Sequence, residues 1–228
     1  MYKRQANDAF RPVTRYFDRI TRPEQIIQSF PNAVQTMLDP ADCGPACISL
    51  CQDIQGQTFE YPEDFFKERI HSIRRPRPDD FQIKEAAEKI KKSKNPIIIS
   101  GGGVFYSNAM EELSNFATKH NIPVTQTVMG YSTMKRDHSH YAGQIGGLGG
   151  KNTNDLAKET DLAIAVGTKL ADFTTGSWAN FENEKFKLVS INVSRFDANK
   201  HMAQAVVGDA KVSLIELSKA LGDWKVGD

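Results

Sequence analysis

The segment from Asn95 to Leu113, NPIIISGGGVFYSNAMEEL, constrains the fold more than any other part of the chain. Its short apolar run of β-branched residues is typical of a buried strand. Three glycines follow the run, and apolar residues then return at helical spacing. A strand that passes through glycines into a helix is a common way to hold a phosphate, because a helix N-terminus favours anions. The segment therefore predicts an α/β domain and raises the question of a nucleotide site.

The same alternation of strands and helices continues to residue 222. Helical patterns occupy residues 79–94, 108–120, 153–160 and 209–222, and strand patterns occupy residues 96–100, 122–127, 162–167, 187–193 and 205–207. Several of these strands are apolar on both faces, which is typical of a parallel sheet covered by helices on two sides. We therefore predict an α/β fold for residues 79–222, with a parallel, doubly wound sheet. In the first helix, we expect a cap at Asp79 and Gln82 and these inward residues: Ile83, Ala86, Ala87 and Ile90.

The first 60 residues contain fewer elements. A helix is predicted after Thr21, which forms a capping box with Glu24, and Pro31 should kink or break it. One strand is predicted at residues 46–50. One helix and one strand cannot bury a core, so we interpret residues 1–60 as part of an α/β domain that is incomplete in this chain.

The two remaining segments are interpreted as connections. Residues 61–78 carry several prolines and the basic run Arg74, Arg75 and Arg77. Such a run is either a phosphate-binding patch or a solvated linker, and the absence of interleaved aromatic residues favours the linker. Residues 223–228 are interpreted as the start of a linker to a further domain.

Composition excludes several classes of protein. The formal net charge is +1, so no overall field selects nucleic acid or an acidic membrane. No apolar stretch is long enough to span a bilayer and the N-terminus shows no secretion signal, so the cytoplasm is the expected compartment. We expect Cys43, Cys47 and Cys51 to be core residues rather than metal ligands. His138 and His140 are interpreted as exposed loop residues, and His71, His120 and His201 as isolated ones.

Glycines and short polar residues follow nearly every predicted strand. Because ligands of parallel sheets bind at the carboxyl ends of the strands, the candidate site is a nucleotide cleft lined by Gly101, Gly102, Gly103, Gly167 and Asp209. The dinucleotide fingerprint fails, however, since its third glycine would fall at Tyr106. The P-loop pattern is absent as well. From the residues alone, a nucleotide or flavin site and ordinary tight turns remain equal alternatives. No catalytic or metal-binding constellation is visible.

Several separated motifs together resemble a known family. They are PIIISGGGVFYSNA, IPVTQTVMG, DHSHYAGQIGGLG, TDLAIAVGTKLADFTTGS, INVSRFDANK and VVGDAK. This order is similar to the central domain of the thiamine-diphosphate enzymes related to acetolactate synthase. Within that family, NDAFRPVTRYFDRITRPEQ and TKLADFTTGS look like the trihydroxycyclohexane-1,2-dione hydrolases of myo-inositol catabolism. Acetolactate synthases more often show Arg-Phe-Asp-Asp-Arg where this chain has Lys169–Phe173.

The resemblance implies the properties of a complete, three-domain enzyme. That enzyme would be cytoplasmic, bind thiamine diphosphate and Mg²⁺, act on a small cyclic dione without nucleic acid or membrane partners, and form a homodimer or homotetramer. Its activating glutamate and Mg²⁺ motif match nothing in this chain, so no catalytic residue can be carried over and the chain alone should be inactive. FAD is not expected in the cleft, which we interpret as vestigial. The alternatives are a piece of an acetolactate-synthase-like carboligase and a stand-alone nucleotide-binding module.

Overall fold

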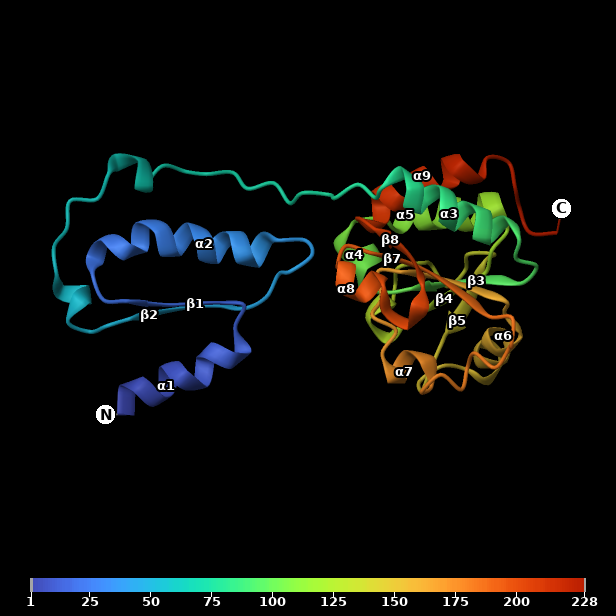
Figure 1. Ribbon diagram of the computed structural model, residues 1–228, viewed down its shortest axis with the longest axis horizontal. Coiled ribbons are helices and arrows are strands. Elements are labelled where there is room, and N and C mark those ends of the chain that lie inside the picture. Colours follow the sequence, from blue (N-terminus) through green and yellow to red (C-terminus); the bar gives the residue numbers. More distant parts are fainter. Residues whose placement is uncertain (1, 228) are drawn as a thin grey trace. The chain divides into compact units, whose positions relative to one another are not determined.

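The computed structural model describes residues 2–227, with the side chains of the first helix described from Gln5 onward. Met1 and Asp228, the outer ends of the first and last predicted segments, lie outside the described residues. The chain divides into two compact units, one that ends at Arg74 and one that begins at Arg75 (Figure 1). No helix in the described part of the chain is long and apolar enough to cross a membrane.

The first unit is a small α/β arrangement. Its main elements are α1 (Tyr2–Phe10), β1 (Tyr16–Ile20), α2 (Ile26–Leu38) and β2 (Ala46–Leu50), with short 3-10 turns η1 (Arg11–Val13), η2 (Pro23–Gln25), η3 (Ile54–Gly56) and η4 (Glu63–Phe65). The strands β1 and β2 pair in parallel. The strand predicted at residues 46–50 is confirmed. The sequence analysis missed α1 and also β1, in which the charged residues Asp18 and Arg19 break the apolar pattern.

The start of α2 differs from the prediction. The side chain that accepts the backbone hydrogen bonds here is that of Gln25, not that of Thr21. Its Oε1 accepts the N–H groups of Thr21 and Arg22 at 2.7 and 2.9 Å. The Thr21–Glu24 capping box is therefore wrong. The helix continues through Pro31 without a break.

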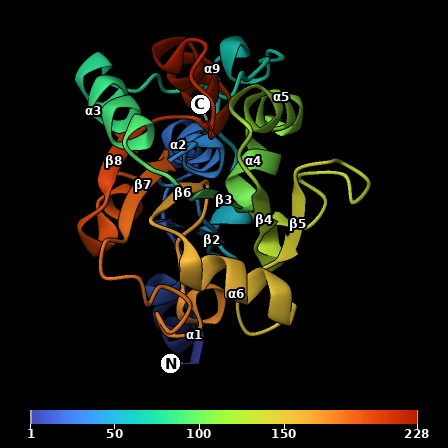
Figure 2. The same ribbon diagram turned by 90° about the vertical axis from the view of Figure 1, so that its right-hand side faces the viewer.

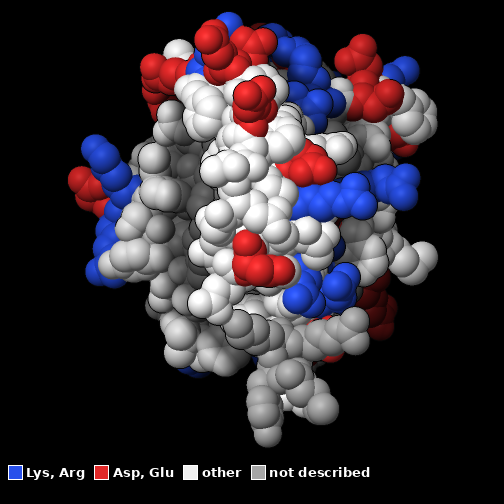
Figure 3. Space-filling view, turned by 90° about the vertical axis from the view of Figure 1, so that its left-hand side faces the viewer, with Lys and Arg blue, Asp and Glu red and all other residues white. Residues whose placement is uncertain are grey.

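The first unit buries little apolar surface. Among its described apolar side chains, only Ile20 and Ala33 are buried, and Phe30 and Leu50 are more than half exposed. On the face drawn in Figure 3, Lys and Arg side chains lie among Asp and Glu side chains, with uncharged residues over a wide area between them. Neither sign of charge forms a continuous field on this face.

The second unit contains a six-stranded parallel sheet with helices. Its strands are β3 (Pro96–Ser100), β4 (Val124–Gln126), β5 (Tyr141–Gln144), β6 (Leu162–Val166), β7 (Lys187–Asn192) and β8 (Gln204–Val207). Its helices are α3 (Asp80–Lys91), α4 (Gly102–Tyr106), α5 (Met110–His120), α6 (Lys151–Glu159), α7 (Asp172–Thr175), α8 (Arg195–Ala198) and α9 (Ala210–Leu221), with 3-10 turns η5 (Val128–Gly130) and η6 (Lys200–Met202). The strand order is β5-β4-β3-β6-β7-β8, and all the pairs are parallel.

Helices cover both faces of this sheet (Figures 1 and 2). On β3, Ile98 joins the cluster that includes buried residues of α3, α5 and α9, while Ile97 and Ile99 face the cluster that includes α6. Each of these three isoleucines is at most 1% exposed, and each contributes roughly 2 kcal/mol of burial free energy. The predicted α/β doubly wound fold is confirmed.

The beginning of α3 is half as predicted. Asp79 caps the helix by accepting the N–H of Phe81 at 2.8 Å, and the four predicted inward residues are buried. Gln82 takes no part in the cap, because its Oε1 accepts the N–H of Val207 in β8 at 2.8 Å. The sequence analysis did not predict β5, α4, α7 or α8, all of which are five residues or shorter.

Candidate functional site

The strand order places the candidate site at the centre of the sheet. The first strand of this sheet, β3, lies at its centre, and β4 and β5 follow on one side of it. The chain then crosses to β6, which pairs with the other side of β3, and β7 and β8 follow outward from there. In such sheets the ligand crevice lies between the two central strands, at their carboxyl ends. Gly101 follows β3 there, and Gly167 follows β6.

The two central loops are in direct backbone contact. A Cβ atom on Gly101 would lie 2.4 Å from the carbonyl oxygen of Gly167, and one on Gly103 would lie 2.6 Å from the Gly167 Cα. Gly167 itself has φ +59°, in the region that favours glycine. Glycine is therefore required at these positions for the close approach of the two loops, with or without a ligand.

Three backbone donors in the β3 loop are already engaged. The N–H of Gly101 donates to the carbonyl of Val166, and the N–H of Gly103 donates to the carbonyl of Gly167, both at 2.9 Å. The N–H of Val104 donates to the carbonyl of Gly101 at 3.1 Å. These three groups point into the protein, so a phosphate would have to compete with internal hydrogen bonds. On its other side, the loop meets η5, the turn that follows β4, because a Cβ on Gly102 would lie 3.2 Å from the Met129 carbonyl oxygen.

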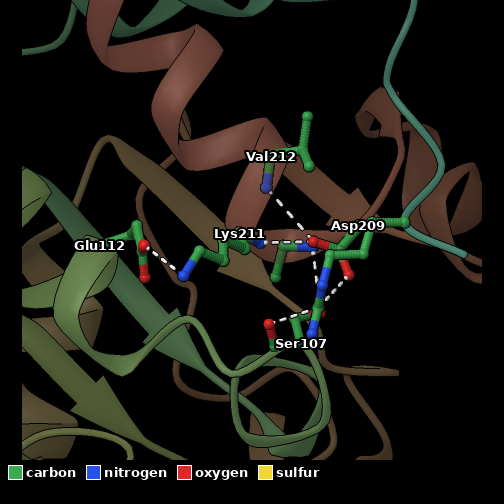
Figure 4. A network of polar contacts seen from close by, with 7 residues as sticks. Ser107, Glu112, Asp209, Lys211 and Val212 are labelled. Carbon is green, nitrogen blue, oxygen red and sulfur yellow. Dashed lines mark hydrogen bonds and ion pairs between the residues drawn. The ribbon is translucent and has the colours of Figure 1, made fainter. Parts of the chain in front are cut away.

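Asp209 lies in a polar network at the start of α9 (Figure 4). Its carboxylate is the N-cap of this helix: Oδ1 accepts the N–H groups of Lys211 and Val212 at 3.0 and 3.3 Å. The other oxygen, Oδ2, accepts Nη1 of Arg75 at 3.0 Å. Asp209 is 4% exposed, so the charge on its buried carboxylate is balanced by helix donors and one guanidinium.

The same network joins Asp209 to the β3 loop through Ser107, the residue that ends α4. Nη1 of Arg75 donates to the Ser107 carbonyl oxygen at 2.5 Å, and the N–H of Ala210 donates to its hydroxyl at 3.3 Å. The N–H of Asp209 also donates to the carbonyl of Pro76 at 2.8 Å. Asp209 is thus in contact with α4 and with the chain segment that precedes α3.

Arg75 is the residue of this network that the sequence analysis missed. Its basic run was interpreted as a solvated linker. Both arginines are exposed, but Arg75 contacts Asp209, and Nη2 of Arg77 lies 2.6 Å from Oε1 of Glu216 in α9. Arg74 keeps a long contact of 3.9 Å to Asp39 in the first unit. Nothing local in the sequence distinguishes Arg75 from its neighbours, because its partner lies 134 residues later.

A second ion pair joins the start of α9 to α5. Nζ of Lys211 lies 2.7 Å from Oε1 of Glu112 (Figure 4). The other carboxylate oxygen of Glu112 is buried and has no hydrogen-bond partner among the described residues. The same holds for the hydroxyl of Ser213. Neither group was identified from the sequence.

Exposed apolar side chains surround the carboxyl edge. They occur in the loops and short helices that follow β3, β4, β6 and β7, and each is more than half exposed: Phe105, Tyr106, Met129, Phe173 and Phe196. Large apolar groups at one edge of a sheet are typical of a surface that meets a ligand or another protein segment. The sequence analysis identified the glycines of these loops but not the aromatic residues beside them.

The cysteines and histidines do not form a metal centre among the described residues, which contain no group of three or more His, Cys, Asp or Glu side chains placed for one. The expected core role of the cysteines is wrong for Cys43, which is exposed, while Cys47 and Cys51 are partly buried. Nε of Arg19 donates to Sγ of Cys51 at 3.2 Å. Cys47 lies in β2 and Cys51 directly follows it, and a sheet of two strands covers little surface.

The histidines are less exposed than expected. His138 and His140 are partly buried, with ring centroids 5.7 Å apart, and His140 contacts Oδ1 of Asn121 at 3.1 Å. His120 is fully buried, and His201 packs on the Trp178 ring at 4.3 Å, so neither is isolated. Burial, followed by the neighbouring His138, lowers the pKa of His140.

The parallel sheet and the glycine loops at its carboxyl edge belong to a known family of enzyme domains. The family described as thiamine pyrophosphate enzyme, central domain, matches residues 83–217, and the chain belongs to this family. Among similar curated proteins is the 3D-(3,5/4)-trihydroxycyclohexane-1,2-dione hydrolase of Clostridium perfringens (strain 13 / Type A), 46% identical over 215 residues, which are 94% of this chain and 34% of that protein. The enzyme of the same name from Bacillus velezensis is 45% identical, over 96% of this chain and 34% of its own length. The predicted resemblance is confirmed.

Solved structures share the fold. A putative thiamin diphosphate-dependent enzyme from Mycobacterium smegmatis superposes with a TM-score of 0.74 at 20% identity, over 92% of this chain and 40% of that chain. The benzoylformate decarboxylase of Polynucleobacter necessarius gives 0.73 at 24% identity, over 90% and 38%. The present chain spans about a third of the length of the curated relatives.

Thiamine diphosphate does not fit the residues described at the carboxyl edge of the central strands. A diphosphate is held in proteins by a divalent cation with oxygen ligands or by a cluster of cationic donors. The described residues offer no such cation site, and Arg75 already contacts Asp209 at the carboxyl edge. No catalytic step can therefore be assigned to residues of this chain.

Proposed function

We propose that this chain is the central-domain part of a thiamine-diphosphate-dependent hydrolase. The enzyme opens the ring of trihydroxycyclohexane-1,2-dione to a 5-deoxy-hexuronate in myo-inositol degradation. The single observation that carries the proposal is the 46% identity to a hydrolase of this name over 94% of the chain. Identity of this extent covers both units and the segment between them, not one motif.

The reaction adds water across the bond between the two carbonyl carbons. In the open-chain product, one of these carbons is a carboxylate and the other is an aldehyde, so there is no net oxidation or reduction. Thiamine diphosphate supplies the carbanion-stabilising chemistry of such C–C cleavages when it is bound. In the proposed enzyme, Mg²⁺ accompanies this cofactor, the enzyme is a cytoplasmic homodimer or homotetramer, and the residues that hold the cofactor are not among those described here.

The role proposed for this chain is structural. The Arg75–Asp209 pair and the Pro76 carbonyl fix the first residues of the second unit on α9. This attachment supports a scaffold whose task is to hold neighbouring parts of the enzyme in place. By itself, the chain should have neither hydrolase activity nor measurable affinity for thiamine diphosphate.

We also propose that the edge lined by Gly101, Gly102, Gly103, Gly167 and Asp209 is a vestigial nucleotide cleft that needs no FAD. The internal hydrogen bonds of Gly101 and Gly103 and the pairing of Asp209 with Arg75 support this interpretation. A phosphate could bind only feebly at the turn that follows Gly103, with a free energy of about 4 kcal/mol.

The experiment that tests the function compares two reactions. The chain is extended with its flanking coding sequence to the length of the relatives and purified with thiamine diphosphate and Mg²⁺. Opening of the cyclic dione, followed by the appearance of the hexuronate, is the expected result. Condensation of pyruvate without ring opening would favour the acetolactate-synthase-like alternative. The 228-residue chain serves as the inactive control, and saturable micromolar binding of thiamine diphosphate to it would contradict its structural role.

A further inference from the structure

The loop that joins β4 to β5 contains a pocket that is separate from the glycine loops of the central strands. Its volume is about 310 Å³, which is at the lower end of the range for small-molecule sites. Six residues line it, from the last residue of β4 onward: Gln126, Tyr131, Ser132, Met134, Lys135 and Arg136. None of these residues belongs to the Gly101–Gly103, Gly167 and Asp209 set.

The rim of the pocket is positively charged. Lys135 and Arg136 are both exposed, and neither forms an ion pair with a described residue. Arg136 is nevertheless held in place, since its Nη2 donates to the Tyr131 hydroxyl at 2.8 Å and its guanidinium carbon lies 5.3 Å from the centre of the Tyr131 ring. No acidic residue lines the pocket. Two cations without a counter-charge create a local preference for an anion.

The floor of the pocket offers an unused acceptor. Gln126 is 1% exposed, and its Nε2 donates to the Met134 carbonyl at 3.0 Å and to the Thr133 hydroxyl at 3.3 Å. Its Oε1 accepts a hydrogen bond from none of the described residues. This oxygen can therefore accept a hydrogen bond from a ligand hydroxyl.

Backbone donors complete the lining. The N–H groups of Ser132 and Met134 donate to no acceptor among the described residues, although Met134 is 3% exposed. Ser132 adopts φ +68°, a left-handed conformation that is rare for a residue with a side chain. The pocket thus combines cationic side chains, free N–H groups, one amide acceptor and the apolar surfaces of Tyr131 and Met134.

We propose that this pocket binds a small oxyanion that carries hydroxyl groups, such as a sugar acid or a sugar phosphate. The guanidinium of Arg136 matches the geometry of a carboxylate or phosphate, and Lys135 adds a second positive charge. A ligand hydroxyl donates to Oε1 of Gln126, and the ligand carbon skeleton packs against Tyr131 and Met134. A neutral sugar lacks the charge for this site, and a bare inorganic anion lacks the hydroxyl.

Calorimetric titration of the 228-residue chain at low salt tests the proposal with four probes: D-glucuronate, D-glucose 6-phosphate, D-glucose and inorganic phosphate. We expect saturable binding of at least one of the two charged sugars, and the one that binds more tightly identifies the carboxylate or the phosphate ester as the natural group. Affinity should fall as salt is added, because exposed charges are screened. No saturation by either charged sugar below about 10 mM, equal binding of D-glucose, or equal binding of inorganic phosphate would overturn the proposal.

Variants locate the binding within the molecule. Arg136→Gln and Lys135→Gln should each weaken binding by about tenfold, since each removes one charge-assisted contact. Lys185→Gln, an exposed lysine outside the pocket, is the matched control and should leave the affinity unchanged. All the affected side chains are exposed, so thermal unfolding midpoints should agree among the variants. Equal affinities for Arg136→Gln and Lys185→Gln would contradict the assignment.

Discussion

Nη1 of Arg75 lies 3.0 Å from Oδ2 of Asp209, although the two residues are 134 positions apart in the chain. The other oxygen of the same carboxylate caps α9. One buried carboxylate therefore fixes both the start of a core helix and the segment that enters the domain.

Replacing Arg75 should destabilise the second unit. Arg75→Leu leaves the 4% exposed carboxylate of Asp209 without its cation, and the free energy of unfolding should fall by about 2 kcal/mol, less than for a fully buried pair because Arg75 is partly exposed. Urea denaturation monitored by circular dichroism measures the change. Arg195→Leu is the matched control, since Arg195 is exposed and its side chain pairs with no described residue. Equal stability of the two variants would show that the pair contributes nothing.

The contact between the two central loops should not tolerate a side chain. In Gly167→Ala, the new methyl group would lie 2.5 Å from the Cα of Gly103, at a residue with φ +59°. The expected loss is about 2–4 kcal/mol of unfolding free energy. Gly150→Ala in the same unit is the control, because its nearest neighbour would be 4.0 Å away. Gly150 is the N-cap of α6, where alanine is less favourable than glycine, so this variant should lose about 1 kcal/mol at most. A Gly167→Ala protein as stable as the control would contradict the observed packing.

The pattern of apolar residues predicts the core of the second unit. The run Pro96–Ser100 becomes β3 with the predicted bounds, and the inward face of α3 is buried as expected. Long, strongly apolar elements can be predicted in this way, because the apolar residues that form the periodic pattern are the ones that become buried. The strand Tyr141–Gln144 escaped prediction, since YAGQ contains no β-branched residue and follows a long loop.

The candidate site was predictable only in part. Glycines that follow strands pointed to the central loops, because loops at the carboxyl ends of neighbouring parallel strands converge. The Arg75–Asp209 pair could not be predicted, since it depends on how the chain returns to the sheet after β8. The pocket lined by Gln126 and residues 131–136 could not be predicted either, because nothing in the sequence shows that the amide of a glutamine at the end of a strand is buried.

His120 should make stability depend on pH. Its Nδ1 donates to the carbonyl of Trp224 at 2.6 Å, so its Nε2, 3.0 Å from Oγ of Ser218, is the acceptor of a neutral ring. Burial lowers the pKa of His120 below the ordinary value of 6.5; the Trp224 carbonyl opposes this shift, and the charge of Lys119 adds to it. The unfolded chain therefore binds a proton that the folded protein resists.

The sign of the effect follows from this difference. The contribution of His120 is fully present above pH 6.5 and is lost as the pH falls through the lowered pKa of the folded state. Urea denaturation at a series of pH values from about 7.5 to 5, followed by the fluorescence of Trp224 and Trp178, should show a smaller pH dependence in His120→Asn than in the parent protein. His71→Asn, at an exposed position, should retain the parent dependence. An unchanged slope in His120→Asn would refute the assignment.

The segment between the two units should be the first site of proteolysis. Residues 67–79 contain no helix or strand, and the first unit buries few apolar side chains. Brief trypsin digestion should cut after Lys67, Arg69 or Arg74, whereas Arg75 and Arg77 precede prolines and should resist. Mass spectrometry should then find a stable product that continues through α9. First cuts within β3–α9 would be inconsistent with a compact second unit.

The prediction that the central cleft binds no flavin is tested most directly by titrating the purified chain with FAD. The N–H groups of Gly101 and Gly103 are engaged by Val166 and Gly167, and Asp209 is paired with Arg75, so we predict a colourless protein and no saturable FAD binding below about 1 mM. ADP, which shares the diphosphate, should behave in the same way. A yellow protein that binds one FAD per chain with micromolar affinity would contradict the account and would move the assignment towards the acetolactate-synthase-like enzymes.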